Sequence, residues 1–206
     1  MKRLSLIRPD LVVKPDIAIV ASSSNMLSTE YGGFIDSFSE VVRFNRAPTE
    51  GYEKHVGSKT TIRVANNHVF GNVPHTGWET EAQPTFFIKE QQNVNVVHLG
   101  PDEGHWENRH DHVAESSKPF LVDYQALIEN VFPLTNARPS AGFGFLFICI
   151  ASGLHPHIFG YGIGEEGCPH YYEENAVSSH HFSEEREVIK VWIEKGYISF
   201  HHRDVS

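Results

Sequence analysis

The chain has 206 residues, a length typical of one domain with a sizeable buried core. Lysine and arginine total 17 and aspartate and glutamate total 26, so the formal charge is −9, with the acidic residues spread along the chain. This balance argues against broad electrostatic binding of nucleic acid or of anionic membranes. With 40% hydrophobic and 21% charged residues, the chain is neither disordered nor a multi-spanning membrane protein, and we predict one soluble globular domain over residues 1–206.

Cysteine usage and the first residues bear on the cellular compartment. Cys149 and Cys168 are too few for a disulfide framework, and Cys149 falls in an apolar run where a buried free thiol is expected. The N-terminal stretch is basic but has no apolar segment long enough for a secretion signal or a spanning helix. These features predict a cytoplasmic protein. Fourteen histidines beside two methionines are unusual, and their positions must decide between metal binding, acid–base chemistry and no special role.

Short apolar runs along the first third of the chain end in amide or hydroxyl residues. The clearest examples are residues 16–21 before Ser22 and Ser23, residues 41–44 before Asn45, and residues 60–64 before Asn66 and Asn67. Buried parallel strands have this pattern, and ligands of open α/β sheets collect at the carboxyl ends of the strands. We therefore expect a cleft lined by groups that hydrogen-bond a ligand without adding charge.

The rest of the chain alternates strands and helices. Strands are predicted at residues 85–89, 94–99, 158–161 and 197–201, and helices at residues 124–131, 142–152 and 183–194. In the last helix, Ile189 and Trp192 are among the apolar residues at core-facing spacing. The alternation predicts an α/β fold whose mainly parallel sheet is flanked by helices on both faces. Residues 100–117, polar and rich in histidine and acidic residues, are predicted to form a loop.

A run of small residues precedes a nearly wholly apolar helix. Ser140 is placed to cap this predicted helix, and Ala141 and Gly142 would let a ligand approach its unpaired backbone N–H groups. Because the peptide dipoles favour negative charge at a helix N-terminus, the segment suits a phosphate or a carboxylate. An ordinary capped core helix is the competing interpretation, and on this segment alone it is favoured because such caps are common.

Two histidines near the last predicted helix are candidates for acid–base chemistry. His170 is followed by Tyr171, Tyr172 and Glu173, and His180 stands just before the helix. A histidine oriented by a carboxylate takes up a proton near neutral pH, as a general base must. The two could divide the work, one beside an anionic leaving group and one at the acceptor. Taken singly, each is more often a surface or capping residue.

A third candidate is a cluster of metal-ligand types in the polar loop. Its members are Asp102, Glu103, His105, Glu107, His110, Asp111 and His112. They would suit zinc, but they lack a recognisable ligand spacing, and a solvated loop is the favoured interpretation. The chain contains no Gly-x-Ser-x-Gly elbow and no P-loop, and Cys149 lies in an apolar helix where a thiolate is costly.

Taken together and in order, these segments resemble the animal-type sialyltransferases, glycosyltransferase family 29, which use CMP-activated sialic acid. The matching segments are residues 17–23, 35–37, 42–49, 51–53 and 56–61 for the large sialylmotif, residues 139–142 through 158–162 for the small motif, residues 170–173 for the third motif, and His180 with Glu185 for the very small motif. Any one of these signatures is weak. All of them in the family's order are hard to obtain by chance.

The resemblance implies a single-domain, GT-A-like, Rossmann-type sandwich that works without a metal or other cofactor. It implies His180 as general base and His170 near the donor phosphate, with Glu185 and Glu173 in support. It implies donor or nucleotide contacts from Ser22, Ser23, Asn45, Ser140, Ala141, Gly142, Gly160 and Tyr171. The chemistry agrees, because the acceptor hydroxyl must lose a proton and departing CMP gains negative charge that N–H donors and a histidine stabilise.

Three features depart from the family pattern. The large motif usually carries Gly-Asn-Ser where this chain has Ala21-Ser22-Ser23, so a shorter side chain replaces the nucleotide-binding asparagine. The cysteines that usually join the large and small motifs fall at Ile17 and Gly153, and the membrane anchor and stem of the Golgi enzymes are not seen. The last two differences fit the cytoplasmic prediction. The change at Ser22 makes Kdo, another CMP-activated acidic sugar, a competing donor.

We therefore expect an inverting glycosyltransferase that moves an acidic sugar, sialic acid or Kdo, from CMP to a hydroxyl of a glycan, oligosaccharide or glycolipid. A glycolipid acceptor would involve peripheral contact with a membrane, and no nucleic acid partner is expected. The alternative, motivated by Ser22, is a non-catalytic CMP-sugar- or glycan-binding module with the same fold. A metallohydrolase built on the histidine-rich loop is a weaker third hypothesis. The sequence does not specify the acceptor, the linkage or the oligomeric state.

Overall fold

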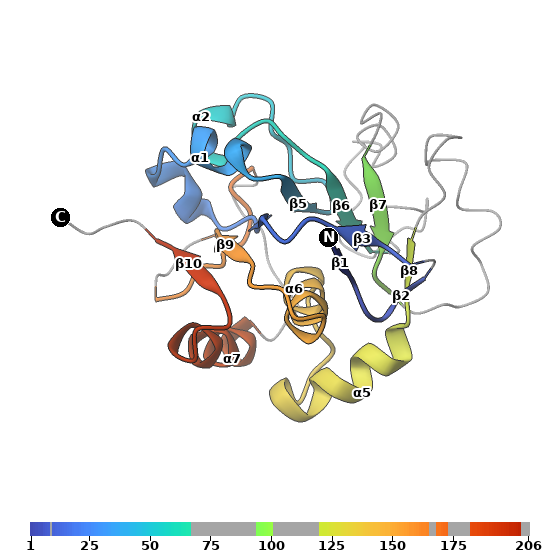
Figure 1. The fold of residues 1–206 in the computed structure, drawn as a ribbon. Coiled ribbons are helices and arrows are strands. Elements are labelled where there is room, and N and C mark those ends of the chain that lie inside the picture. The colour runs from blue at the N-terminus through green and yellow to red at the C-terminus, as the bar shows by residue number, and fades with distance from the viewer. Residues whose placement is uncertain (9, 67–93, 101–119, 165–167, 173–181, 203–206) are drawn as a thin grey trace, which may run out of the picture.

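The computed structural model describes residues 1–8, 10–66, 94–100, 120–164, 168–172 and 182–202. Within these ranges one large sheet dominates the molecule (Figure 1). Its strands are β2 (Ile7–Arg8), β4 (Ile17–Val20), β5 (Glu40–Phe44), β6 (Ile62–Ala65), β7 (Asn95–His98), β8 (Phe120–Val122), β9 (His157–Phe159) and β10 (Ser199–His201). Their spatial order is β10-β9-β4-β5-β6-β7-β8-β2.

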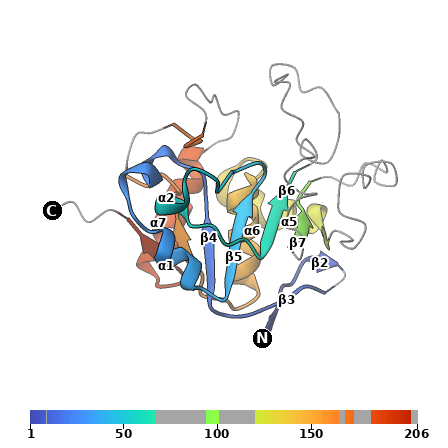
Figure 2. The same cartoon turned by 90° about the horizontal axis from the view of Figure 1, so that it is seen from above.

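The sheet is parallel from β10 through β8, and β2 alone pairs antiparallel, against the β8 edge. In the central register Ile17 lies opposite Glu40 and Val42 lies opposite Ile62. All residues of β4 and of β6 are buried, as expected of parallel strands that are covered on both faces. Figure 2 shows β4, β5, β6 and β7 following one another across the sheet.

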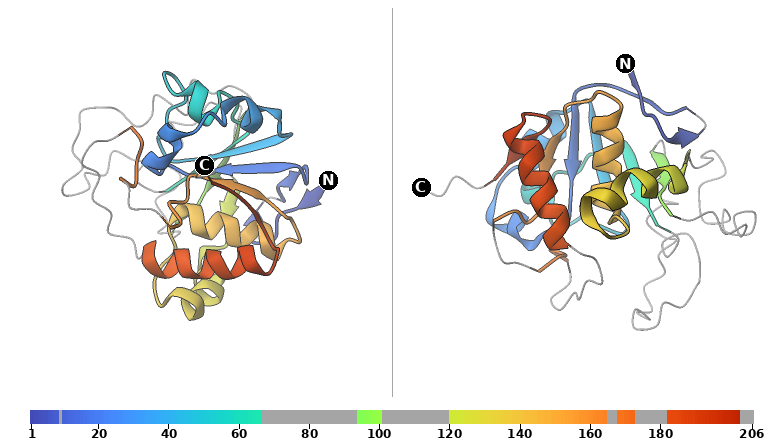
Figure 3. Two further views of the ribbon diagram at one scale, coloured as in Figure 1. Left: turned by 90° about the vertical axis from the view of Figure 1, so that its left-hand side faces the viewer. Right: turned by 90° about the horizontal axis from the view of Figure 1, so that it is seen from below.

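Helices cover both faces of the sheet. On one face lie α1 (Gly32–Ser37) and α2 (Glu53–Val56), and on the other lie α5 (Tyr124–Thr135), α6 (Ala141–Ala151) and α7 (Phe182–Glu194) (Figure 3, left). A short 3₁₀ helix, η1 (Ser24–Ser28), follows β4. These observations confirm the predicted α/β fold with a mainly parallel sheet between helices.

The helix α6 is buried because its sequence is apolar on nearly all sides. Phe143, Phe145 and Cys149 have no exposed surface, and the rings of Phe143 and Trp192 stack with centroids 5.1 Å apart. The α6 helix thus packs on the sheet beside α7 (Figure 3), and burial of such side chains stabilises the fold by about 1.5–3 kcal/mol each. Burial also raises the pKa of the Cys149 thiol, which excludes it as a nucleophile, as predicted.

The predicted element bounds are close to those observed. The apolar helix predicted at 142–152 is α6, the one predicted at 183–194 is α7, and the strands predicted at 94–99 and 158–161 are β7 and β9. The helix predicted at 124–131 continues to Thr135. The strand predicted at 85–89 and the loop at 100–117, beyond Gly100, lie outside the described residues. Over the part of the chain described here, no helix combines the length and apolarity needed to traverse a lipid bilayer.

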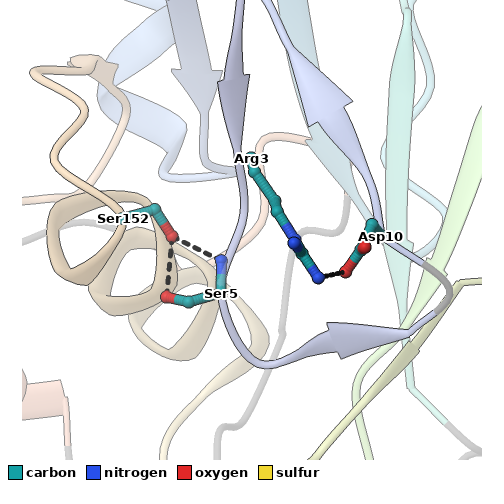
Figure 4. Close-up of polar contacts among 4 residues, drawn as sticks. All are labelled: Arg3, Ser5, Asp10 and Ser152. Carbon is teal, nitrogen blue, oxygen red and sulfur yellow. Dashed lines mark hydrogen bonds and ion pairs between the residues drawn. The ribbon is translucent and has the colours of Figure 1, made fainter.

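The N-terminal segment forms a hairpin that packs against the far end of α6. Strand β1 (Lys2–Arg3) pairs antiparallel with β3 (Val12–Val13). The Ser5 backbone N–H donates to Ser152 Oγ at 2.7 Å, and the two hydroxyls lie 2.9 Å apart, while Arg3 forms an ion pair with Asp10 (Figure 4). The hairpin buries the apolar side chains of Leu4, Ile7, Leu11 and Val13. It thereby joins the C-terminal end of α6 to the β8 edge of the sheet.

Candidate functional site

The strand order creates a switch point between β4 and β9. From β4 the chain builds the sheet outward to β8 and then returns to place β9 on the other side of β4. The carboxyl ends of these two strands are joined by backbone hydrogen bonds, Ala21 N–H to Phe159 O at 2.8 Å and Ser23 N–H to Gly160 O at 3.0 Å. Open α/β sheets bind ligands outside the strand ends at such a point.

Ser22 and Ser23 lie at this switch point. Ser23 is buried and its hydroxyl accepts a hydrogen bond from the Asn25 N–H at 3.5 Å, which caps η1. The Ser22 carbonyl accepts a hydrogen bond from the Tyr171 N–H at 2.8 Å. The segment that carries His170 and Tyr171 therefore lies directly beside the end of β4.

Gly160 is required at its position. Its φ is +68°, and a Cβ there would lie 2.7 Å from the Ala21 carbonyl oxygen. Both the left-handed backbone and the close approach of the two strand ends favour glycine. This residue therefore sets the spacing of the β4 and β9 carboxyl ends.

The Tyr171 side chain is buried in the core. Its ring lies 4.9 Å from the ring of Tyr52, and its hydroxyl donates to the Pro48 carbonyl. Burial raises the pKa of Tyr171 to about 12, so the hydroxyl stays protonated. Its neighbour His170 stacks on Tyr172 with ring centroids 5.2 Å apart. In this arrangement the hydroxyl of Tyr171 holds the loop after β5, while His170 belongs to the switch-point segment.

Asn45 joins the loops that follow β5 and β6. Its backbone is left-handed, with φ of 44°, a conformation that asparagine tolerates. Its N–H donates to the Val64 carbonyl at 2.8 Å, and its side-chain oxygen accepts from the Asn66 N–H at 3.1 Å. The amide side chain thus orders two strand ends, and Asn66, singled out with it from the sequence, is its partner.

Two buried arginines support these loops, and sequence reasoning missed both. Arg43 donates to the Val56 carbonyl at 2.7 Å, and Arg63 donates to the Ala47 carbonyl at 2.9 Å. Each is 1% exposed, and burial lowers the pKa of each to about 10, so both stay charged at neutral pH. Two cations under the strand ends favour an anionic ligand there. A signal was present, since a lone arginine interrupts each of the apolar runs 41–44 and 60–64.

The N-terminus of α6 is capped by Ser140, and hydrogen bonds between Ser140 and Glu185, here called the Ser140–Glu185 clasp, hold it against α7. The Ser140 hydroxyl accepts from the Phe143 N–H at 3.2 Å, as predicted, and donates to Glu185 Oε2 at 2.6 Å. The Ser140 N–H donates to Glu185 Oε1, also at 2.6 Å. Glu185 is 4% exposed, and its burial raises the carboxyl pKa against the opposing effect of the Ser140 hydrogen bonds. Glu185 therefore fixes the first turn of α7 against the start of α6.

Residues after β9 link this clasp to the switch point. The Tyr161 hydroxyl donates to the Gly142 carbonyl at 3.1 Å. At Gly162, a Cβ would lie 3.0 Å from an Arg186 side-chain nitrogen and 3.3 Å from Ser23 Oγ, so Arg186 of α7 reaches the same edge as Ser23. Arg186 was not predicted, although it directly follows Glu185. It adds a cation to the edge where β4, β9, α6 and α7 meet.

The described candidate residues are therefore brought together at one edge of the sheet. Ser22, Ser23, Gly160, His170 and Tyr171 form the switch-point part, and the Ser140–Gly142 turn with Glu185 forms the adjoining part. Asn45 belongs to the neighbouring loops. His180, Glu173 and the acidic, histidine-rich cluster at 102–112 lie outside the described residues.

The fold and this edge define an α/β protein with a candidate ligand site at the carboxyl ends of parallel strands. The family model of glycosyltransferase family 29 (sialyltransferase) matches residues 16–197. The chain belongs to this family, as the motif resemblance predicted.

The curated relatives and the solved structure that resemble this chain are named sialyltransferases. Beta-galactoside alpha-2,6-sialyltransferase 2 of Rattus norvegicus is 27% identical over 174 residues, covering 76% of this chain and 33% of the relative. The protein of the same name from Danio rerio is 50% identical over 58 residues, 28% of this chain and 11% of the relative. The chain thus spans about a third of the length of such relatives. A mammalian sialyltransferase crystallised with Gal-beta-1-3GalNAc-ortho-nitrophenol shares the fold, with a TM-score of 0.65 and 23% identity over 91% of this chain and 69% of that one.

Proposed function

We propose that the protein transfers sialic acid from CMP-sialic acid to a glycan hydroxyl with inversion at the anomeric carbon. Membership of glycosyltransferase family 29 supports the donor, and the names of the relatives support the reaction. The single observation that carries the proposal is the meeting of the β4 end, the β9 end and the Ser140-capped start of α6 at one edge. The β4 end belongs to the large motif, and the other two segments are the two ends of the small motif.

In this proposal the site binds an anionic nucleotide sugar through N–H groups and fixed cations. Ser22, Ser23 and Asn45 contact the nucleotide, and the Ser140–Gly142 turn with His170 contacts the phosphate. The capped helix start supports the phosphate role, because its N–H groups and its dipole favour negative charge. Arg43 and Arg63 contribute positive potential without contact.

His180 is proposed as the general base that removes the acceptor proton, while departing CMP is stabilised by the phosphate-binding groups. Glu185 acts by fixing the helix that follows His180, and Glu173 supports His170. We propose that catalysis needs no metal or other cofactor, because CMP is a good leaving group, and that the sheet is of the GT-A-like kind. The cytoplasmic location expected from the sequence stays a prediction.

A galactoside is the acceptor to test first. The curated relatives are named beta-galactoside sialyltransferases, and the solved neighbour is a complex with Gal-beta-1-3GalNAc-ortho-nitrophenol. We propose a galactose hydroxyl on a glycan, oligosaccharide or glycolipid as the attacking group.

The decisive experiment replaces His180 by Ala in the full chain. We expect loss of transfer from CMP-sialic acid to a galactoside, with CMP affinity by calorimetry nearly unchanged. His181→Ala is the matched control, since it removes the adjacent histidine, and it should keep activity. A His180→Ala protein that stays folded and active would refute the base assignment.

Assays of the wild-type protein identify the donor sugar and test the binding-module alternative. Sialic acid transfer without Kdo transfer supports the proposal, and the reverse would assign Kdo as the donor sugar. CMP-sugar binding with neither transfer nor donor hydrolysis would favour the non-catalytic module that the serine at position 22 suggests.

A further inference from the structure

A histidine pair lies on the sheet edge formed by β9 and β10. His157 on β9 and His201 on β10 occupy neighbouring parallel strands, where His157 is opposite Ser199 and His201 is opposite Phe159. His157 Nδ1 and His201 Nε2 are 2.8 Å apart, and the ring centroids are 5.0 Å apart with planes at 13°. Neither residue has a role in the proposed transfer reaction. Among the described residues, the pair belongs to the many histidines that the reaction does not use.

Aromatic side chains hold both rings in place. Phe38 contacts the ring of His157 with centroids 4.8 Å apart, and Phe159 stacks on His201 with centroids 4.6 Å apart and planes at 10°. Phe34 adds an edge contact to His201 at 5.1 Å. Because both rings are packed, their facing nitrogens are preorganised, which lowers the cost of binding a shared ligand.

The charge environment suits a cation at this pair. Burial, followed by a neighbouring histidine, lowers the pKa of both His157 and His201. The Asp16 carboxylate, held by the Ser39 N–H at 2.9 Å, acts on His157 in the opposite direction. An imidazole binds a metal through a nitrogen lone pair, and a nearby carboxylate favours positive charge.

We propose that His157 Nδ1 and His201 Nε2 together bind a divalent transition-metal ion such as Zn²⁺, which bridges β9 and β10. Imidazole nitrogen is a preferred ligand of zinc, copper and nickel. Each ring takes the tautomer that turns its lone pair to the ion, with its proton on the other nitrogen. The described residues contain no group of three or more histidine, cysteine or acidic side chains placed to hold a metal, so water completes the shell.

Binding requires the two nitrogens to move apart. Two nitrogens that bind one tetrahedral zinc ion at about 2.0–2.1 Å are about 3.3 Å apart. Small rotations of the two rings from their present 2.8 Å separation would therefore admit the ion in place of the shared hydrogen bond. With two ligands from the described residues, binding is weaker than at a closed four-ligand site. The bound ion would stabilise the edge strand β10, because it binds only the folded pairing of β9 and β10.

The test uses the full chain, freed of metal, with Zn²⁺ added and thermal stability measured. We expect zinc to raise the melting temperature of the wild type and of His155→Gln. His155 is the matched control because it lies next to the pair but bonds Ser199 Oγ at 2.8 Å instead. His157→Gln and His201→Gln should each lose the effect and bind zinc about 100-fold more weakly, since losing one arm of a chelate removes its effective concentration.

A second measurement distinguishes this pair from the other histidines of the chain and does not depend on the variants folding. In the wild-type protein labelled with nitrogen-15, substoichiometric Cu²⁺ should first broaden the amide signals of Ile158, Phe200 and their neighbours on β9 and β10. Broadening that begins elsewhere would overturn the proposal. So would folded His157→Gln and His201→Gln proteins that bind zinc as the wild type does.

Discussion

At the scale of single residues, Glu185 determines how α6 and α7 meet. Its two carboxylate oxygens accept the N–H and the hydroxyl of Ser140, and the carboxylate is almost fully buried. A buried donor left without an acceptor costs about 1–3 kcal/mol. The start of α6 is therefore expected to depend on this one side chain.

Replacement of Glu185 by Ala should lower the free energy of unfolding by about 1–3 kcal/mol, because Ser140 loses both partners. Glu185→Gln should lose less, since the amide still offers an acceptor to the Ser140 N–H. Urea denaturation followed by circular dichroism measures both. Glu184→Ala, on the exposed neighbour, is the control and should change stability little. Equal losses for Ala and Gln at position 185 would contradict the geometry.

A glycine-to-alanine pair separates backbone strain from steric contact. Gly160→Ala should destabilise by more than 1 kcal/mol, because both the positive φ and the Ala21 carbonyl oppose a Cβ. Gly51 has φ of +80° but no atom within 4 Å of the Cβ position, so Gly51→Ala isolates the strain alone. Thermal unfolding of both variants should give Gly160→Ala the lower melting temperature. The opposite ranking would show that the two strand ends are not packed this closely.

At the scale of elements, Asp36 ties α1 to the loop that leads from α2 into β6. Its carboxylate accepts hydrogen bonds from the Ser58 N–H, the Ser58 hydroxyl at 2.8 Å and the Lys59 N–H at 2.9 Å. Burial alone raises the pKa of Asp36, but the hydrogen bonds together outweigh it, and the net pKa lies below the ordinary value of 3.8. The charged form is thus the one that the fold stabilises.

The lowered pKa fixes the sign of a pH dependence. The contribution of Asp36 to stability is complete above its unfolded pKa of 3.8 and is lost as the pH falls through the folded pKa. Asp36→Asn should therefore cost about 1–3 kcal/mol at pH 7 and progressively less below about pH 4. Urea titrations from pH 7 to pH 3 measure the difference. A constant gap between the two proteins across that range would contradict this role.

Sequence reasoning succeeded for elements whose own residues show the apolar pattern of a buried segment. The strands β4, β5 and β6 are apolar runs with polar ends, and α6 is apolar on all sides. It missed β8 and β2, which are too short to show a period, and α1, which begins with two glycines. The Ser140–Glu185 clasp could not be predicted from physics, because it joins residues 45 apart that meet only after α6 and α7 pack. The resemblance of Ser140 and Glu185 to two family motifs placed both residues in the site, but it did not predict that they are in contact.

At the scale of the whole molecule, the N-terminal hairpin adds to the part of the chain that the family model matches. Residues 1–15 precede the matched range, yet Ile7 and Arg8 extend the large sheet, and Leu4 and Leu11 are buried in its core. The bonds between Ser5 and Ser152 join this segment to the end of α6. The hairpin therefore belongs to the same folding unit as the matched region.

Deletion of residues 1–13 should lower the melting temperature strongly, because it removes Leu4, Ile7, Leu11 and Val13 from the core and uncovers the β8 edge. Arg3→Ala is the control. It breaks only an ion pair whose side chains are 68% and 49% exposed, and such pairs contribute about 0–1 kcal/mol. Differential scanning calorimetry compares the two. A truncated protein as stable as the full chain would show that the hairpin is dispensable.

The order in which the strands occupy the sheet also differs from the order in which a ribosome makes them. β4 is synthesised well before its second neighbour, β9, which begins only at His157, and β10 follows at Ser199. A growing polypeptide must therefore carry one hydrogen-bonding edge of β4 unpaired until β9 has been made. Chains that stop before residue 157 are expected to aggregate through that edge. The sheet is thus complete only after β9 and β10 have been made.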